Sequence, residues 1–201
     1  MSNNENLIGK KILIIGLSNP ISITLGDILT KLGCQLHLAD TSDKILKESA
    51  TFIKKQNGIT VEIHPTDLSE QINIAVLALE CEDVDIIINT FNTTTINNVH
   101  ELEYEQWRDH LGITLYTAMN IAEEFLENID EQKNLVIVNV GSKMKKNNDE
   151  NIGAVVLNGA LVALSEALNN KVKSREVRVI SFIPETGTSE IESATALVNF
   201  F

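Results

Sequence analysis

The sequence predicts an α/β protein built on a doubly wound parallel sheet of about six strands in the order 3-2-1-4-5-6, with helices on both faces. Three observations predict it. Short apolar runs alternate with amphipathic segments along the whole chain. The runs are apolar at consecutive positions, as in 86–88, which is typical of strands covered on both faces. The first run ends at Gly16 and leads through a polar turn into a helical pattern.

Each element follows from its own pattern. Strands are predicted where Ile, Val and Leu are concentrated, at 11–16, 35–39, 60–64, 84–89, 133–140 and 177–183. Helices are predicted where apolar residues recur at helical spacing, near 20–33, 42–56, 69–81, 103–128, 152–172 and 188–199. The alternation gives one Rossmann-like domain over residues 1–201. Its polar first segment, 1–9, is expected to be flexible.

Composition narrows the classes of function. A net charge of −12 and a pI near 4.7 argue against nucleic acid and against anionic membrane surfaces, because no basic stripe offsets the negative field. The start of the chain has no apolar segment of the signal-peptide type, and no apolar run is read as long enough to span a bilayer. Cys34 and Cys81 fit no metal or redox spacing. We therefore expect a cytoplasmic protein with reduced core thiols and no metal.

The turn after the first strand is the first candidate site. Gly16 suits a point where a Cβ would hinder the chain. Ser18 or Asn19 can cap the following helix, and Pro20 is tolerated in its first turn. The free N–H groups of that turn would face a phosphate. Because the usual G-x-G-x-x-G pattern is absent, a strand–helix turn that binds nothing remains the alternative.

Ligand groups in such a sheet come from the carboxyl ends of the strands. Asp40 stands about 20 residues past the glycine turn, where a carboxylate accepts both ribose hydroxyls of NAD(H) and repels the 2′-phosphate of NADP(H). Asp67 is placed to bind an adenine amino group. For both aspartates the alternative is a helix cap. Asn89 would lie along the nicotinamide ribose, with a purely structural role as its alternative.

The chain resembles the short-chain dehydrogenases/reductases from about residue 10 to about residue 190. The resemblance rests on Asp40, Asp67-Leu68, Asp85-Ile86-Ile87-Ile88-Asn89, Trp107-Arg108-Asp109-His110-Leu111, Ile137-Val138-Asn139-Val140-Gly141-Ser142, Val177-Arg178-Val179 and Pro184. The glycine turn is most similar to the G-x5-S-I-x2-G turn of enoyl-acyl-carrier-protein reductases. That similarity adds Ser22 and Ile23 to the candidate cofactor contacts, beside Leu68.

The resemblance implies an NAD(P)-dependent oxidoreductase that uses four side chains. A tyrosine donates a proton, a lysine one helical turn later holds the nicotinamide ribose, a serine orients the substrate, and an asparagine positions a water. Ser142 matches the serine. The lysine position holds Gly159, and the asparagine position holds Thr114. The tyrosine position holds Val155, or Ile152 with the enoyl-reductase spacing.

Three functions stay open. The favoured one is a non-catalytic NAD(H)-binding or regulatory and assembly protein, a pseudoenzyme. The second is an NAD(H)-dependent carbonyl or enoyl reductase whose missing groups are replaced by Lys143, Lys145, Lys146 or His110. The third is a structural relative that binds no nucleotide.

The resemblance also bears on assembly and on the end of the chain. After Pro184 the sequence lacks the family's substrate-covering segment and a seventh strand, so we expect a truncated member with a small, open substrate site. A homodimer is expected through the helices at 103–128 and 152–172, because the second is apolar around much of its circumference, Leu161 included. The terminal 200–201 pair is expected to cover the sheet edge or a neighbouring subunit.

Overall fold

The computed structural model describes residues 6–92, 103–128, 133–144, 152–172 and 176–201. Its six strands form one parallel sheet in the order β3-β2-β1-β4-β5-β6. The strands are β1 (Lys11–Ile15), β2 (Gln35–Asp40), β3 (Glu62–Pro65), β4 (Ile86–Asn89), β5 (Leu135–Val140) and β6 (Val177–Phe182). The helices are α1 (Pro20–Lys31), α2 (Asp43–Asn57), α3 (Gln71–Glu80), α4 (Tyr104–Asn128), α5 (Ile152–Lys171) and α6 (Glu190–Val198). The predicted fold class and strand order are confirmed.

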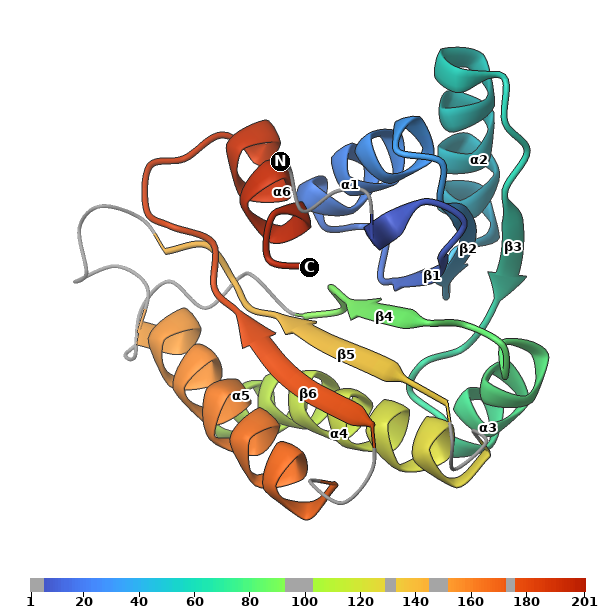
Figure 1. Ribbon diagram of the computed structural model, residues 1–201. Helices are drawn as coiled ribbons and strands as arrows, with labels where there is room; N and C mark the ends of the chain where they lie inside the picture. Colours follow the sequence, from blue (N-terminus) through green and yellow to red (C-terminus); the bar gives the residue numbers. More distant parts are fainter. Residues whose placement is uncertain (1–5, 93–102, 129–132, 145–151, 173–175) are drawn as a thin grey trace.

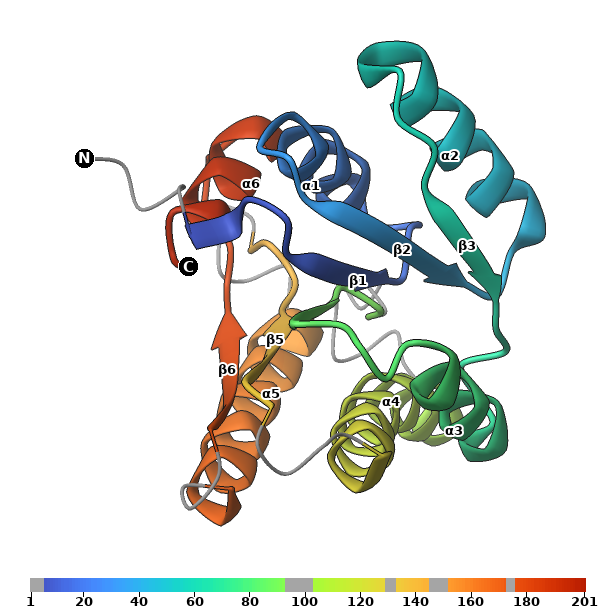
Figure 2. The ribbon, with the colours of Figure 1, turned by 45° about the vertical axis from the view of Figure 1, so that its right-hand side comes forward.

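The helices form two layers, one on each face of the sheet. Helices α1, α2 and α6 cover one face, and α3, α4 and α5 cover the other (Figures 1 and 2). Alternate residues of each strand enter two separate hydrophobic cores. In β1, for example, Ile12 and Ile14 pack toward α1, whereas Leu13 and Ile15 pack toward α3 and α4. Burial on both sides explains why the strands are apolar at consecutive positions.

Local signals set the ends of the helices. Asn19, Ser42 and Ser189 cap α1, α2 and α6, each accepting a backbone N–H of the first turn through its side chain. Ser189 and Glu192 complete a capping box. Helix α2 ends at Gly58, whose φ of +71° is the left-handed conformation common after a helix.

The segment before β1 contacts the core through one apolar residue. Leu7 is buried in the core under α1, and its carbonyl accepts hydrogen bonds from the Lys10 N–H and the Cys34 thiol. Residues 1–5 lie outside the described part of the chain, and the flexibility of the segment 1–9 stays a prediction.

Helix α5 corrects an expectation. By length and composition, Ile152–Lys171 is apolar enough to cross a membrane, with a mean hydropathy of 1.5. In the fold it is a helix of the α/β layers, packed on β6 and α4 with Ala154, Leu157 and Leu161 buried. Only a third of its most apolar window is buried, however, so one side of α5 leaves apolar surface uncovered.

Gly16 joins the ends of three neighbouring strands. Its N–H donates to Ala39 O of β2 at 2.9 Å, and its carbonyl accepts from the Thr90 hydroxyl, just after β4, at 2.5 Å. Its φ is +88°, and a Cβ there would lie 2.6 Å from the backbone nitrogen of Phe91. Only glycine satisfies both the left-handed backbone and the close approach.

Replacing Gly16 by alanine should therefore lower the free energy of unfolding more than replacing a glycine that has a left-handed backbone but no close neighbour. Gly58→Ala is the matched control, because its φ is +71° and a Cβ there meets nothing within 4 Å. We expect Gly58→Ala to lower the free energy of unfolding by about 1–2 kcal/mol. Gly16→Ala should lose about 1–3 kcal/mol more, from overpacking. Urea unfolding measures both, and equal losses would contradict the close approach.

Candidate functional site

The glycine turn and the start of α1 are closed by hydrogen bonds within the protein. The Asn19 side chain accepts from the Ile21 N–H at 3.2 Å, and its backbone carbonyl accepts from the Ser22 N–H at 3.0 Å. Pro20 has no N–H. The Ser22 hydroxyl is buried, 2.7 Å from that of Thr90. Two of the donors expected to face a phosphate, the Ile21 and Ser22 N–H groups, are thus paired with Asn19, and a phosphate would compete with Asn19 for them.

The other two predicted contacts of this turn lie nearer the surface. Ser18 is exposed and does not cap α1, because Asn19 takes that role. Ile23 is half-buried on α1. The turn is tied to β4 as well, because the Asn19 amide donates to Thr90 O at 3.4 Å. The position of the turn is therefore fixed from both sides.

Asp40 is the best-positioned of the predicted residues. Its Oδ2 accepts from the Leu17 N–H of the glycine turn at 2.6 Å, and its Oδ1 accepts from the Ser42 N–H at 2.8 Å. The residue is 3% exposed. Ser42, not Asp40, caps α2. A carboxylate offers about four acceptor positions, so two remain for hydroxyl donors.

Asp67 and Leu68 follow the neighbouring strand β3. Asp67 is exposed, and hydrogen bonds from the Ser69 hydroxyl and N–H hold the pKa of its carboxyl below the usual value. It does not cap α3, whose N-cap is Glu70. Leu68 is buried beneath it, and its carbonyl accepts from the Thr117 hydroxyl at 3.3 Å. Asp40 and Asp67 thus place two carboxylates at the ends of adjacent strands.

The side chain of Asn89 makes hydrogen bonds within the fold. Its Nδ2 donates to Asn139 Oδ1 at 3.0 Å, and Asn139 Nδ2 donates to Ser165 Oγ of α5 at 3.1 Å. Its Oδ1 accepts from the Phe91 N–H at 3.1 Å. This buried chain of amides links β4, β5 and α5, as the structural alternative for Asn89 requires.

Ser142 is held from α5 by a residue that the sequence analysis did not single out. The Asn158 amide accepts from the Ser142 N–H and donates to the Ser142 carbonyl, both at 2.8 Å. The Ser142 hydroxyl is 3.5 Å from Asn92 Oδ1, and Asn92 Nδ2 donates to Val140 O at 2.9 Å. A lone asparagine in the apolar stretch of α5 was the one signal that indicated this contact.

Helix α5 presents no titratable group at the positions where the resemblance placed the tyrosine and lysine. Ile152, Val155 and Gly159 all lie exposed on the helix. A Cβ at Gly159 would meet nothing within 4 Å, so its small size is not required by packing. These positions offer neither a proton donor nor a cation.

Two candidates on α4 contain unpaired polar atoms. Within the part of the chain that the structure describes, His110 Nδ1 and Thr114 Oγ1 are buried and have no hydrogen-bond partner. They stand one helical turn apart. Buried polar atoms are nearly always paired, so this pair is available to a water or a ligand. Lys143 is exposed, and 145–146, the other two candidate lysines, lie outside the described residues.

A small cavity separates the glycine turn from α6. Its volume is about 130 Å³, and it is lined by Asn19, Pro20, Ile21, Gly141, Ser142, Lys143, Pro184, Glu190 and Ser193. Helix α6 packs on α1 and contributes Glu190 and Ser193 to the lining of this cavity. Ligand sites usually measure about 300–1,000 Å³, so this cavity is small for a dinucleotide and its substrate.

The two cysteines are free and lie in different cores. Burial raises the pKa of the Cys34 thiol to about 11 and that of the Cys81 thiol to about 12. Neither is therefore poised as a thiolate nucleophile.

Residues 10–196 match the family model for short chain dehydrogenases. The chain belongs to the short-chain dehydrogenase family. Among curated proteins it is 26% identical over 185 residues to a fatty acyl-CoA reductase of Acinetobacter baylyi, covering 88% of this chain and 62% of the relative. It is 22% identical over 194 residues to a 3-oxoacyl-acyl-carrier-protein reductase of Escherichia coli, covering 96% and 78%.

Solved structures of short-chain dehydrogenases share the fold. A short chain dehydrogenase from Mycobacterium smegmatis superposes with a TM-score of 0.84 at 17% identity, covering 98% of this chain and 88% of that one. An NAD⁺-bound xylitol dehydrogenase gives 0.77 at 18% identity, covering 89% and 71%. The chain spans 62% of the fatty acyl-CoA reductase and 54% of an uncharacterized oxidoreductase of Mycobacterium tuberculosis, to which it is 28% identical.

The two hydrogen bonds between the Asn158 side chain and the Ser142 backbone, called here the Asn158 clamp, predict how two substitutions change the stability of this short-chain dehydrogenase. Asn158→Ala leaves a buried N–H and a buried carbonyl unpaired, so we expect unfolding free energy to fall by about 2–4 kcal/mol. Ser142→Ala removes only the long hydroxyl contact and should cost less than about 1 kcal/mol. Chemical denaturation followed by circular dichroism measures both. Similar losses for the two variants would contradict the clamp.

Proposed function

We propose that this short-chain dehydrogenase binds NAD(H) mainly through the adenosine half and does not perform the family's proton transfer, so that it serves as a binding or regulatory protein. The proposal rests on the difference between the adenosine end of the site, at Asp40, and the nicotinamide end, at α5. The Asp40 carboxylate is fixed beside the glycine turn by two backbone donors. At the other end, α5 offers Val155 and Gly159 in place of a tyrosine and a lysine.

The residues at the adenosine end fit the dinucleotide. Asp40 keeps two acceptor positions for ribose hydroxyls, and its charge disfavours a 2′-phosphate. The exposed Asp67 carboxylate beside it suits an adenine amino group. Bound NAD(H) would supply a hydride donor or acceptor.

The phosphate and nicotinamide end fits less well. Asn19 accepts hydrogen bonds from the Ile21 and Ser22 N–H groups, and the acidic residue Glu190 is among those that line the small cavity. Without the lysine, nothing on α5 holds the nicotinamide ribose. We therefore expect the adenosine diphosphate portion to supply nearly all of the affinity.

Nucleotide titration tests this directly. We expect NADH to bind more tightly than NADPH, and ADP-ribose to bind about as tightly as NADH. Asp40→Ala should reduce the preference for NADH by about 1–3 kcal/mol, the range for hydrogen bonds to a charged group. Asp43→Ala is the matched control, because it removes a nearby exposed carboxylate that is paired with Lys47. Calorimetry measures all of these affinities. Tighter binding of NADPH, an equal effect at Asp43, or no binding would contradict the proposal.

A second candidate is an NAD(H)-dependent reductase with displaced catalytic groups. The unpaired His110 Nδ1 and Thr114 Oγ1 favour it, because a histidine can donate a proton near neutral pH. Two relatives are named as reductases of fatty acyl-CoA and of 3-oxoacyl-acyl-carrier protein, so such acyl substrates are the ones to assay with NADH. Turnover that is lost in His110→Ala would support this candidate over the first. No turnover supports the first.

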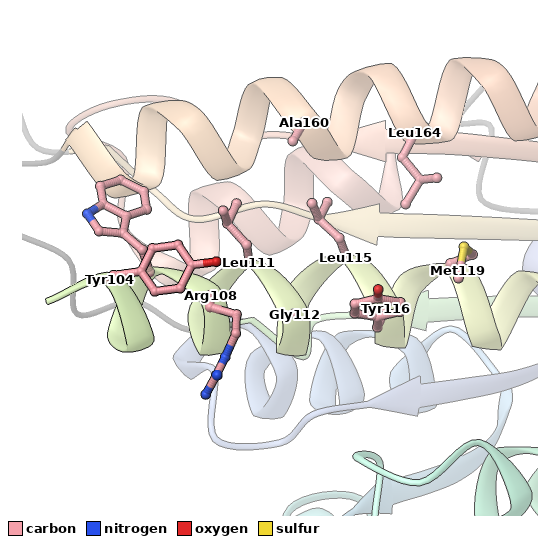
Figure 3. A pocket seen from close by; sticks show the side chains of 10 residues that line it. Tyr104, Arg108, Leu111, Gly112, Leu115, Tyr116, Met119, Ala160 and Leu164 are labelled. Carbon is pink, nitrogen blue, oxygen red and sulfur yellow. The ribbon is translucent and has the colours of Figure 1, made fainter. Parts of the chain in front are cut away.

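For assembly, we infer that α4 and α5 pair with the same helices of a second copy. An apolar groove of about 590 Å³ runs between them, lined by Leu111, Leu115 and Met119 of α4 and by Ala160 and Leu164 of α5 (Figure 3). Val156 of α5 is 43% exposed and stands one helical turn before Ala160, so it extends the apolar surface of the groove. The same surface on two copies, related by a twofold axis, buries both grooves at once.

The exposure of each side chain decides which residue can test this dimer. Leu161 is 2% exposed, so a charge there would disrupt the core instead of the surface. Tyr116 is 65% exposed and lines the groove. We expect the 22.2 kDa chain to form a dimer and Tyr116→Glu to give a folded monomer. Ile191→Glu, 66% exposed on α6, is the control and should stay dimeric. Light scattering measures the mass of the particle. A monomeric unmodified chain would contradict the dimer, and so would binding of the chain to lipid vesicles.

A further inference from the structure

Three potential metal ligands meet on the sheet face that carries α3, away from the glycine turn. His37 lies on β2, His64 on β3, and Cys81 directly after α3. His37 Nδ1 is 3.1 Å from His64 Nε2, and Cys81 Sγ is 3.8 Å and 3.6 Å from the same two nitrogens. His37 and Cys81 are buried, and His64 is half-buried.

The topology explains why these residues meet. Strands β2 and β3 are parallel, with His37 opposite Glu62 and Ala39 opposite His64, so both histidines point to one face. Helix α3 lies on that face together with α4 (Figure 2). The end of α3 brings Cys81 to the two histidines. The sequence separations follow no metal-binding motif, so the spacing of the cysteines did not reveal the cluster.

The distances match those between ligands of a tetrahedral ion. With zinc bonds of about 2.0–2.1 Å to nitrogen and about 2.3 Å to sulfur, tetrahedral ligand atoms lie about 3.3–3.6 Å apart. The three observed separations run from 3.1 to 3.8 Å. An ion therefore fits among the three atoms with only small side-chain movements.

A neighbouring carboxylate orients one of the histidines. His64 Nδ1 is 2.9 Å from Glu80 Oε2, so this nitrogen carries the proton and Nε2 keeps its lone pair toward His37 and Cys81. A carboxylate on the far nitrogen is the usual arrangement for a metal-bound histidine. Glu62 Oε2 is 3.6 Å from His37 Nδ1 and largely exposed, which places a fourth oxygen ligand or a water within reach.

We propose that His37, His64 and Cys81 bind one Zn²⁺ ion, with Glu62 or water in the fourth position. Two imidazoles and a thiolate select zinc over Mg²⁺ and Ca²⁺, which take oxygen ligands. The ion would tie the edge strand β3 to β2 and to the end of α3. It is a structural site that does not depend on nucleotide binding.

Metal titration of the full-length, tag-free chain tests the site after treatment with a chelator. We expect one Co²⁺ per chain, with the visible bands of tetrahedral cobalt and a thiolate-to-cobalt charge-transfer band, both removed when Zn²⁺ displaces it. Cys81→Ala should abolish the charge-transfer band and weaken binding at least tenfold. Cys34→Ala is the matched control and should keep both, because Cys34 is a buried thiol in the other core that donates to Leu7 O.

Two further variants keep the test decisive if Cys81→Ala does not fold. Glu80→Gln leaves all three ligands in place and should weaken zinc binding by about 10- to 100-fold through the orientation of His64. His64→Gln should lose the bound ion. Zn²⁺ should also raise the thermal midpoint of the unmodified chain and of Cys34→Ala, but not of His64→Gln. No saturable binding, or binding unchanged in Cys81→Ala or His64→Gln, would overturn the proposal.

Discussion

The junction at Gly16 is the constraint on which the rest of the structure depends. The backbone leaves β1 there with φ of +88°, donates to β2, and passes so close to Phe91 that no Cβ fits. The Gly16 carbonyl accepts from the hydroxyls of Thr90 and Ser22, which ties β4 and α1 to the same point. These contacts align the carboxyl ends of the three strands, and with them the position of Asp40.

The same hydrogen bonds that stabilise this junction also limit what it can bind. Asn19 accepts from the Ile21 and Ser22 N–H groups of α1, and the Ser22 hydroxyl is buried against Thr90. Stabilisation of the empty fold thus competes with the recognition of a phosphate. Asp40 is different, because two backbone donors hold its carboxylate and leave other lone pairs unused. Asp40 is thus held in position by the backbone, whereas a phosphate at the start of α1 would have to compete with Asn19.

The sequence predicted the elements of this fold far better than its side-chain contacts. Consecutive apolar residues give the buried strands of a parallel sheet, and caps such as Asn19 mark helix starts, so the positions of the elements follow from local chemistry. The strand order follows from the rules of doubly wound βαβ folds. Side-chain contacts between distant elements follow from neither. Asn158 reaches Ser142 only because α5 packs beside the segment that follows β5, and the composition of α5 did not reveal that Leu161 is buried. The cluster around Cys81 likewise depends on the register of β2 and β3.

We propose that the adenosine end of the nucleotide site is retained in this chain and that the nicotinamide end is lost. Saturation-transfer NMR on NADH mixed with the protein tests it most directly, because the method reports which protons of the ligand lie against the protein. Strong transfer to the adenine and adenine-ribose protons, with weak transfer to the nicotinamide protons, is the expected result. Equal transfer to both ends would contradict the claim.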